Sequence, residues 1–213
     1  IYRNQNPISF RLTSWDTPIT EVPAAKLPDH VGQSMSLHLA LVHFPTLDKL
    51  GQTVCTSVTN LDVHDFGRIA TTYGAGKVWL VHPYEAQQKF LRRILHHWRS
   101  GWGSTYNPTR REALTTVELT DDLEQMAERI EAAEGRRPVM IGTSARSNPH
   151  SISYAALRER LREEPETPHC LVFGTGWGLH PDALEMMDWM LDPIKGPTDW
   201  NHLSVRAAAG IIL

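Results

Sequence analysis

Three alternate glycines, Gly174, Gly176 and Gly178, follow the continuous apolar run Leu171–Phe173. A buried strand that leads into such a turn and then into a helix lets the backbone approach a ligand closely. A dinucleotide-binding turn would have its third glycine at position 179, where Leu179 stands, and would lie early in the chain. The segment therefore predicts a ligand-binding turn of another type, and a glycine-rich turn without a ligand is the alternative.

A second candidate is Arg68, which lies on a helix predicted over Asn60–Tyr73. The spacing of its apolar residues directs one helix face to a sheet and places Asp65 and Arg68 on a neighbouring face. His64 is four residues before Arg68, so the two side chains project together. The alternative is a surface helix on which Asp65 and Arg68 form an ion pair.

The third segment begins near Asp192 and runs through a loop rich in proline and glycine into a small-residue helix over Leu203–Leu213. Such a helix must pack closely against another element. Ser204 or Asn201 would cap its N-terminus. The loop before the helix is polar and contains Asp199, which a purely structural helix does not require.

Basic residues are concentrated between Lys77 and Arg111, where seven of them stand against Glu85 alone. Aromatic residues follow at Trp98 and Tyr106, and such a stripe suits phosphate contact with stacking on unpaired bases. The alternative is a solvated helix face. The candidate RNA-binding residues are Lys89, Arg92, Arg93, Arg99, Arg110 and Arg111.

Metal and nucleophile sites are poorly supported. The chain has 11 histidines, but no pair at i, i+4 encloses the glutamate of a zinc protease. Cys55 and Cys170 are too far apart for a paired-cysteine zinc site or a disulfide framework, and Cys170 is expected in the core. We therefore predict no metal.

Alternating apolar runs and amphipathic stretches predict an α/β fold with a mostly parallel sheet sandwiched by helices over residues 37–213. The expected strands are Leu37–Phe44, Lys77–Val81, Thr115–Leu119, Pro138–Gly142, Cys170–Phe173 and Trp189–Leu191. The expected helices are Asn60–Tyr73, Tyr84–Arg99, Asp121–Glu134, Ser153–Glu163, Pro181–Met187 and Leu203–Leu213. Residues 1–36 contain four prolines and no periodicity, which predicts an N-terminal extension or linker.

The composition of the chain excludes several classes of protein. The chain has 213 residues, 41% of them hydrophobic, and a formal net charge of -3, which excludes a histone-like binder. Its first residues show no basic-then-apolar signal pattern, and no apolar run approaches the length needed to cross a membrane, so secretion and membrane spanning are both unsupported. The cysteine usage favours the cytoplasm.

Together, the three segments resemble the α/β-knot (SPOUT) RNA methyltransferases, which carry three such motifs in this order. The most similar subfamily is that of predicted S-adenosylmethionine (SAM)-dependent RNA methyltransferases, and the resemblance covers residues 37–213. The strings that carry it are Ala40–Pro45, Thr59–Asp65, Gly103–Pro108, Thr143–Arg146, Phe173–Leu179 and Asn201–Arg206.

The resemblance implies a homodimer with a C-terminal trefoil knot that transfers a methyl group from SAM to tRNA or rRNA. Arg68 matches the essential arginine of the ribose-methylating relatives. Asn201 stands one place before the family's asparagine, whose position His202 occupies, and Asp199 is a candidate base. The implied cofactor-binding residues are Thr143, Ser144, Phe173, Gly174, Thr175, Gly176, Gly178, Leu179, Ile194, Gly196, Leu203 and Ser204.

Two other functions fit the same segments. One is a non-catalytic RNA-binding or dimerisation module attached to another tRNA-modifying enzyme. The other is a nucleotide-binding regulatory domain that uses Gly174–Gly178 to hold phosphate.

Overall fold

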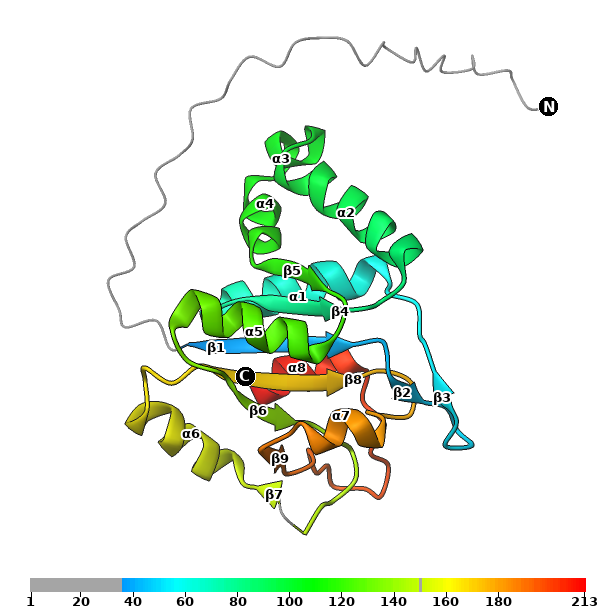
Figure 1. Ribbon diagram of the computed structural model, residues 1–213, viewed down its shortest axis with the longest axis vertical. Coiled ribbons are helices and arrows are strands. Elements are labelled where there is room, and N and C mark those ends of the chain that lie inside the picture. The colour runs from blue at the N-terminus through cyan, green and yellow to red at the C-terminus, as the bar shows by residue number, and fades with distance from the viewer. Residues whose placement is uncertain (1–35, 150) are drawn as a thin grey trace, which may run out of the picture. The chain divides into compact units, whose positions relative to one another are not determined.

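The computed structural model describes residues 36–149 and 151–213 (Figure 1). Its strands are β1 (Leu37–Val42), β2 (Thr46–Leu47), β3 (Thr53–Val54), β4 (Val78–Val81), β5 (Val117–Thr120), β6 (Val139–Gly142), β7 (Ser151–Ile152), β8 (His169–Gly174) and β9 (Trp189–Leu191). Its helices are α1 (Asn60–Tyr73), α2 (Glu85–Arg99), α3 (Trp102–Tyr106), α4 (Pro108–Thr115), α5 (Leu123–Glu134), α6 (Tyr154–Glu163), α7 (Pro181–Glu185) and α8 (Val205–Ile212).

Seven strands form one sheet in the order β5-β4-β1-β8-β6-β9-β7, and β2 and β3 form a separate hairpin. Every strand pair in the large sheet is parallel. The central strand β1 is buried along its whole length, as expected for a parallel sheet covered on both faces. The expected α/β class with a mostly parallel sheet is confirmed.

Alternate residues of β1 supply two cores on opposite faces of the sheet. Leu39 and Leu41 face a core that includes residues of α1, α2, α4, α6 and α8, whereas Ala40 and Val42 face a core that includes residues of α5 and α7. Figure 1 shows α5 and α7 in front of the sheet, with α1 and α8 behind it. The sheet is therefore the middle layer of three.

Local sequence signals explain why the first helix begins and ends where it does. Thr59 and Asp62 form a capping box, in which each side chain accepts a hydrogen bond from the backbone of the other residue. Gly74 ends the helix in the left-handed conformation, with φ of 68°, which favours glycine. The expected range Asn60–Tyr73 is confirmed.

The connection between β4 and β5 contains two helices that the sequence analysis did not predict, α3 and α4. Asn107 caps α4 by accepting a hydrogen bond from the amide of Arg110, and Pro108 fills the first helical turn. These are standard signals for the start of a helix, but the sequence analysis considered this segment only for its basic residues. The strand expected over Thr115–Leu119 starts instead at Val117, because Thr115 belongs to α4.

The C-terminal helix α8 follows β9 in the chain and packs against α1 and β8. The trefoil knot stays a prediction, as does the division between residues 1–36 and the domain, since residues 1–35 lie outside the described part. Within the described part, no helix is long and apolar enough to span a membrane.

Candidate functional site

A cavity of about 700 Å³ lies where β6 and β8 end and the C-terminal loop approaches them. The carboxyl ends of parallel strands are the usual ligand-binding edge of an α/β sheet. Thr143 and Ser144 follow β6, Gly174 ends β8, and all three line the cavity. The opposite wall comes from the loop before α8 and includes Asp199 and Leu203.

The glycine turn is held by the β2–β3 hairpin. The amide of Leu47 donates to the carbonyl of Gly178 at 3.0 Å, and the amide of Trp177 donates to the carbonyl of Leu47 at 2.8 Å. Gly176 has φ of 60°, and a Cβ there would lie 2.7 Å from the Leu47 carbonyl oxygen. The turn therefore requires glycine at position 176 both for its conformation and for the close approach of the hairpin.

A partly buried chain of polar side chains extends this support into the sheet. The Thr175 hydroxyl donates to the Val42 carbonyl at 2.9 Å and lies 2.5 Å from the Thr56 hydroxyl. His43 Nδ1 lies 2.9 Å from the same Thr56 oxygen. Burial lowers the pKa of His43 to about 4, so this imidazole is neutral at pH 7.

The C-terminal loop is tied to the segment after β6. Asn201 Nδ2 donates to the Ala145 carbonyl at 2.9 Å, and both residues line the cavity. Ser204 caps α8 by accepting from the amide of Ala207 at 3.2 Å, which confirms one of the two expected caps. These contacts hold the two sides of the cavity in one arrangement.

Arg206 connects α8 to the first half of α1. Its Nη1 lies 2.9 Å from Asp62 Oδ1 and its Nε lies 3.2 Å from Asp65 Oδ2. Asp65 therefore pairs with Arg206 and not with Arg68, contrary to the alternative considered from the sequence. Arg68 is exposed and does not line the cavity.

The structure brings most of the other predicted site residues to the cavity. Those that line it are Thr143, Ser144, Gly174, Thr175, Gly176, Gly178, Ile194, Asp199, Asn201, Leu203 and Ser204. Three do not line it: Phe173 packs edge-to-face against Phe66 in the core, Leu179 is buried in the opposite core, and Gly196 lies in the exposed part of the C-terminal loop.

Three chemically distinctive residues of the cavity were missed. Tyr154 begins α6, and its buried hydroxyl has no hydrogen-bond partner in the structure. Asp192 and Arg146 also line the cavity. Burial, with Asp192 nearby, raises the pKa of Tyr154. Arg146 belongs to the segment Thr143–Arg146, which carries part of the family resemblance. Tyr154 and Asp192 come together only through the parallel pairing of β7 with β9.

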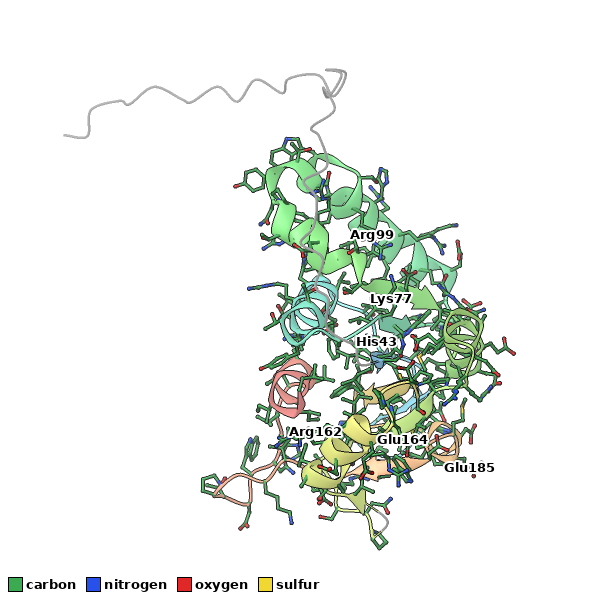
Figure 2. All side chains as sticks on the ribbon, turned by 90° about the vertical axis from the view of Figure 1, so that its left-hand side faces the viewer. His43, Lys77, Arg99, Arg162, Glu164 and Glu185 are labelled. Atoms are coloured by element: carbon green, nitrogen blue, oxygen red, sulfur yellow. The ribbon has the colours of Figure 1, made fainter. Side chains whose placement is uncertain are left out.

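The candidate RNA-binding residues divide into two groups. Arg92 lies 2.6 Å from Glu85, and Arg99 donates to the carbonyls of Leu114 and Val117. Figure 2 shows Arg99 between α2 and the sheet. The other candidates are freer: Lys89 lies 3.8 Å from Glu85, the Arg110 guanidinium lies 4.7 Å from the Trp98 ring centre, and Arg93 and Arg111 have no ion pair among the described residues.

Two other predictions concern metals and cysteines. Among residues 36–149 and 151–213, no three His, Cys, Asp or Glu side chains form a group that could hold a metal ion. Cys170 is fully buried in the core, as expected, and burial raises its pKa.

Comparison with known proteins decides the family. The model of the SAM-dependent RNA methyltransferase family matches residues 36–213. The chain belongs to this family. The expected activity class, a SAM-dependent RNA methyltransferase, is therefore confirmed.

Relatives of the chain fall into two length classes. An uncharacterized protein of Aquifex aeolicus (strain VF5) is 41% identical over 178 residues, which are 84% of this chain and 86% of that protein. A tRNA (guanine-N(1)-)-methyltransferase of Oleidesulfovibrio alaskensis is 42% identical over 84% of this chain, but the match covers only 41% of that enzyme.

Solved structures share the fold at low sequence identity. A probable methyltransferase from Bordetella pertussis Tohama I superposes with a TM-score of 0.56 and 13% identity, over 84% of this chain and 91% of that one. TrmJ from Z. mobilis ZM4 gives a TM-score of 0.51 and 13% identity, over 83% of this chain and 65% of that one. The expected resemblance to SAM-dependent RNA methyltransferases is confirmed by the family match, and these structures show that methyltransferases share the fold.

Proposed function

We propose that the cavity at the ends of β6 and β8 binds SAM and that the protein transfers its methyl group to a nucleotide of tRNA or rRNA. The observation that carries the proposal is the cavity itself, which lies at the ligand-binding edge of the sheet and contains the buried, unpartnered hydroxyl of Tyr154. A buried polar group without a partner costs free energy unless a ligand or water satisfies it. The cavity volume of about 700 Å³ is ordinary for a small-molecule site.

The residues of the cavity suit SAM, which combines a sulfonium, an ammonium and a carboxylate with an adenosine. Asp192 and Asp199 offer anionic groups for the positive charges, and Arg146 offers a cation for the carboxylate. Ile194 and Leu203 provide apolar surface for the adenine ring. When bound, SAM supplies an electrophilic methyl group.

The chain's own residues must position the acceptor, remove its proton and exclude water. Asp199 is the proposed base, because its carboxylate lines the cavity on the loop that closes it. Asn201 keeps that loop in place through Ala145 and has its amide oxygen left to orient the acceptor. Arg68 is the proposed group that binds the acceptor's phosphate or stabilises the charge developing on the acceptor.

A homodimer explains why Arg68 lies outside the cavity of its own chain. Leu61, 57% exposed, precedes Arg68 by seven residues and so shares its face of α1. Tyr73 and Ile211 are also exposed large apolar residues on the packed pair α1 and α8. A two-fold partner that covers this surface would receive Arg68 near its own cavity.

The tRNA acceptor is supported by the relative from Oleidesulfovibrio alaskensis, a tRNA (guanine-N(1)-)-methyltransferase, and tRNA modification favours a cytoplasmic location. Because the chain spans 41% of that relative, the nucleotide and atom that the relative methylates do not transfer to this chain. The proposal covers the reaction class and the type of acceptor.

Mass mapping of nucleosides in RNA from cells with and without the gene tests the proposal. We expect one methylated nucleoside to disappear without the gene and to return when the wild-type gene is restored, but not when its Asp199→Asn or Arg68→Ala form is restored. Identical methylation in both cells would contradict the proposal. Return of the nucleoside with both variants would contradict the assigned roles.

A further inference from the structure

The helix α2 has two basic flanks, and only one of them has its charges compensated by the protein. Gln88, Leu91 and Leu95 turn towards the protein, and the flank that carries Arg92 and Arg99 is compensated. Arg92 pairs with Glu85, and Arg99 pairs with backbone carbonyls and lies 4.0 Å from Glu118. The charges of Arg92 and Arg99 are therefore already compensated by other groups of the protein.

The other flank is open. Its residues at positions 86, 89, 90, 93, 94 and 97 follow helical spacing and line a groove of about 540 Å³ together with Asn60 and Trp98. None of the eight residues that line the groove is acidic. Arg93 is exposed and has no ion pair or hydrogen bond among the described residues. Lys89 makes only a long contact of 3.8 Å to Glu85, which Arg92 approaches more closely.

Aromatic surface accompanies this free charge. Phe90 is 44% exposed and lines the groove between Lys89 and Arg93. The indole of Trp98 is fixed by edge contacts with His64 and His97, whose ring centres lie 5.3 and 4.9 Å away. Arg110 lies over the same indole at 4.7 Å.

Contacts between α1 and α8 link the groove to the proposed SAM site. Asn60, the first residue of α1, lines the groove, and Asp62 in the same helical turn is held by Arg206 of α8. Val205, next to Arg206, lines the SAM cavity. The groove and the SAM cavity share no lining residue, so they are separate sites. Figure 1 shows α2, α3 and α4 grouped beyond the β5 edge of the sheet.

We propose that this groove, formed by α2 and the start of α1, binds an unpaired nucleotide of the RNA substrate, with a base stacked on Phe90 and a backbone phosphate held by Arg93 and Lys89. This inference rests on the proposed function and adds a binding site that is distinct from the SAM cavity. The combination of an exposed aromatic face and uncompensated cations selects single-stranded RNA, because the bases of a duplex have no free faces.

Binding of a short fluorescein-labelled oligouridylate tests the role of Phe90. Phe90→Leu keeps the apolar volume but removes the aromatic face, so we expect affinity to fall by about 5- to 150-fold, the range for loss of one base–aromatic stack. Phe90→Trp should bind as the wild type does. Annealing the probe to its complement should weaken binding to the wild type.

A matched pair of charge variants tests the role of the open flank. Arg93→Gln should flatten the plot of log affinity against log salt concentration by about 0.7, the counterion-release value for one phosphate on a single strand. Arg92→Gln removes the same charge from the compensated flank and should change the slope less. Equal changes from the two variants would overturn the assignment of the phosphate to Arg93.

Other outcomes would also contradict the proposal that the groove binds a nucleotide. If Phe90→Leu binds RNA normally, or if the wild type binds neither oligouridylate nor total tRNA, the proposed nucleotide site is wrong. If Phe90→Leu changes the sedimentation mass instead of RNA affinity, the groove is covered by a second copy of the chain. Calorimetry with SAM separates these failures from failure of the proposed function, because the groove variants should keep wild-type SAM affinity.

Discussion

Arg68 has no hydrogen bond or ion pair among the described residues, whereas Arg206 is held by two carboxylates of the same helix α1. An exposed arginine without partners adds little to stability. The role proposed for Arg68 depends instead on its contact with the RNA acceptor. We therefore expect Arg68→Ala to abolish methyl transfer and leave the melting temperature unchanged. Arg158→Ala, which removes an exposed arginine from α6, is the control and should keep full activity. A lower melting temperature with normal activity would show that Arg68 has a structural role.

His43 makes the support of the glycine turn sensitive to acid. Its pKa is about 4 in the folded protein because of burial, although Asp62 opposes the shift, and about 6.5 in the unfolded chain. The unfolded state therefore binds more protons between these values, and stability is lost as the pH falls from 6.5 towards 4. His43→Gln should remove about 2 kcal/mol of the stability change between pH 7 and pH 5.

Urea unfolding at both pH values measures this difference. The matched control is His96→Gln, which changes an exposed histidine of α2. His82 and other buried histidines contribute to the total, so only the difference between variant and wild type is diagnostic. An unchanged pH dependence in His43→Gln would contradict the neutral, buried state of this imidazole.

The contact between α1 and α8 couples the position of the helix that carries Arg68 to the position of the helix that lines the cavity. Arg206→Met leaves Asp62, whose side chain is 6% exposed, without its cation, so the free energy of unfolding should fall by about 2 kcal/mol. SAM affinity should fall as well, because α8 supplies Val205 and Ala208 to the cavity. Arg206→Lys, which can reach one carboxylate, should recover part of both losses. Loss of stability with unchanged SAM affinity would contradict the coupling.

Elements with regular spacing could be predicted from the sequence, whereas the contacts between distant segments could not. The cap at Thr59, the strand before Gly174 and the expected helices and strands depend on local signals, and the structure has them. The β2–β3 hairpin holds the glycine turn through backbone hydrogen bonds, which do not depend on a particular side-chain pattern in the hairpin. Tyr154 and Asp192 escaped prediction for a similar reason, because strand pairing brings them together.

At the scale of the whole molecule, the position of Arg68 outside the cavity of its own chain predicts that the protein acts as a homodimer. Sedimentation equilibrium should give twice the chain mass of 24.1 kDa, and Leu61→Glu should shift the protein to the monomer. Mixing Arg68→Ala subunits with Ser144→Trp subunits, whose cavity is filled, should restore about a quarter of the wild-type activity, because each mixed dimer has one complete site. No restoration from a mixture shown to contain mixed dimers would place Arg68 and the cavity in the same subunit's site.

Transfer of a tritiated methyl group from SAM to RNA extracted from cells that lack the protein tests the central claim most directly. We predict that a catalytic amount of the wild-type chain makes the RNA radioactive, that Ser144→Trp prevents it by filling the cavity, and that Arg158→Ala does not change it. SAM binding in calorimetry without any radioactivity in the RNA would contradict the claim and indicate a non-catalytic module of a larger tRNA-modifying enzyme.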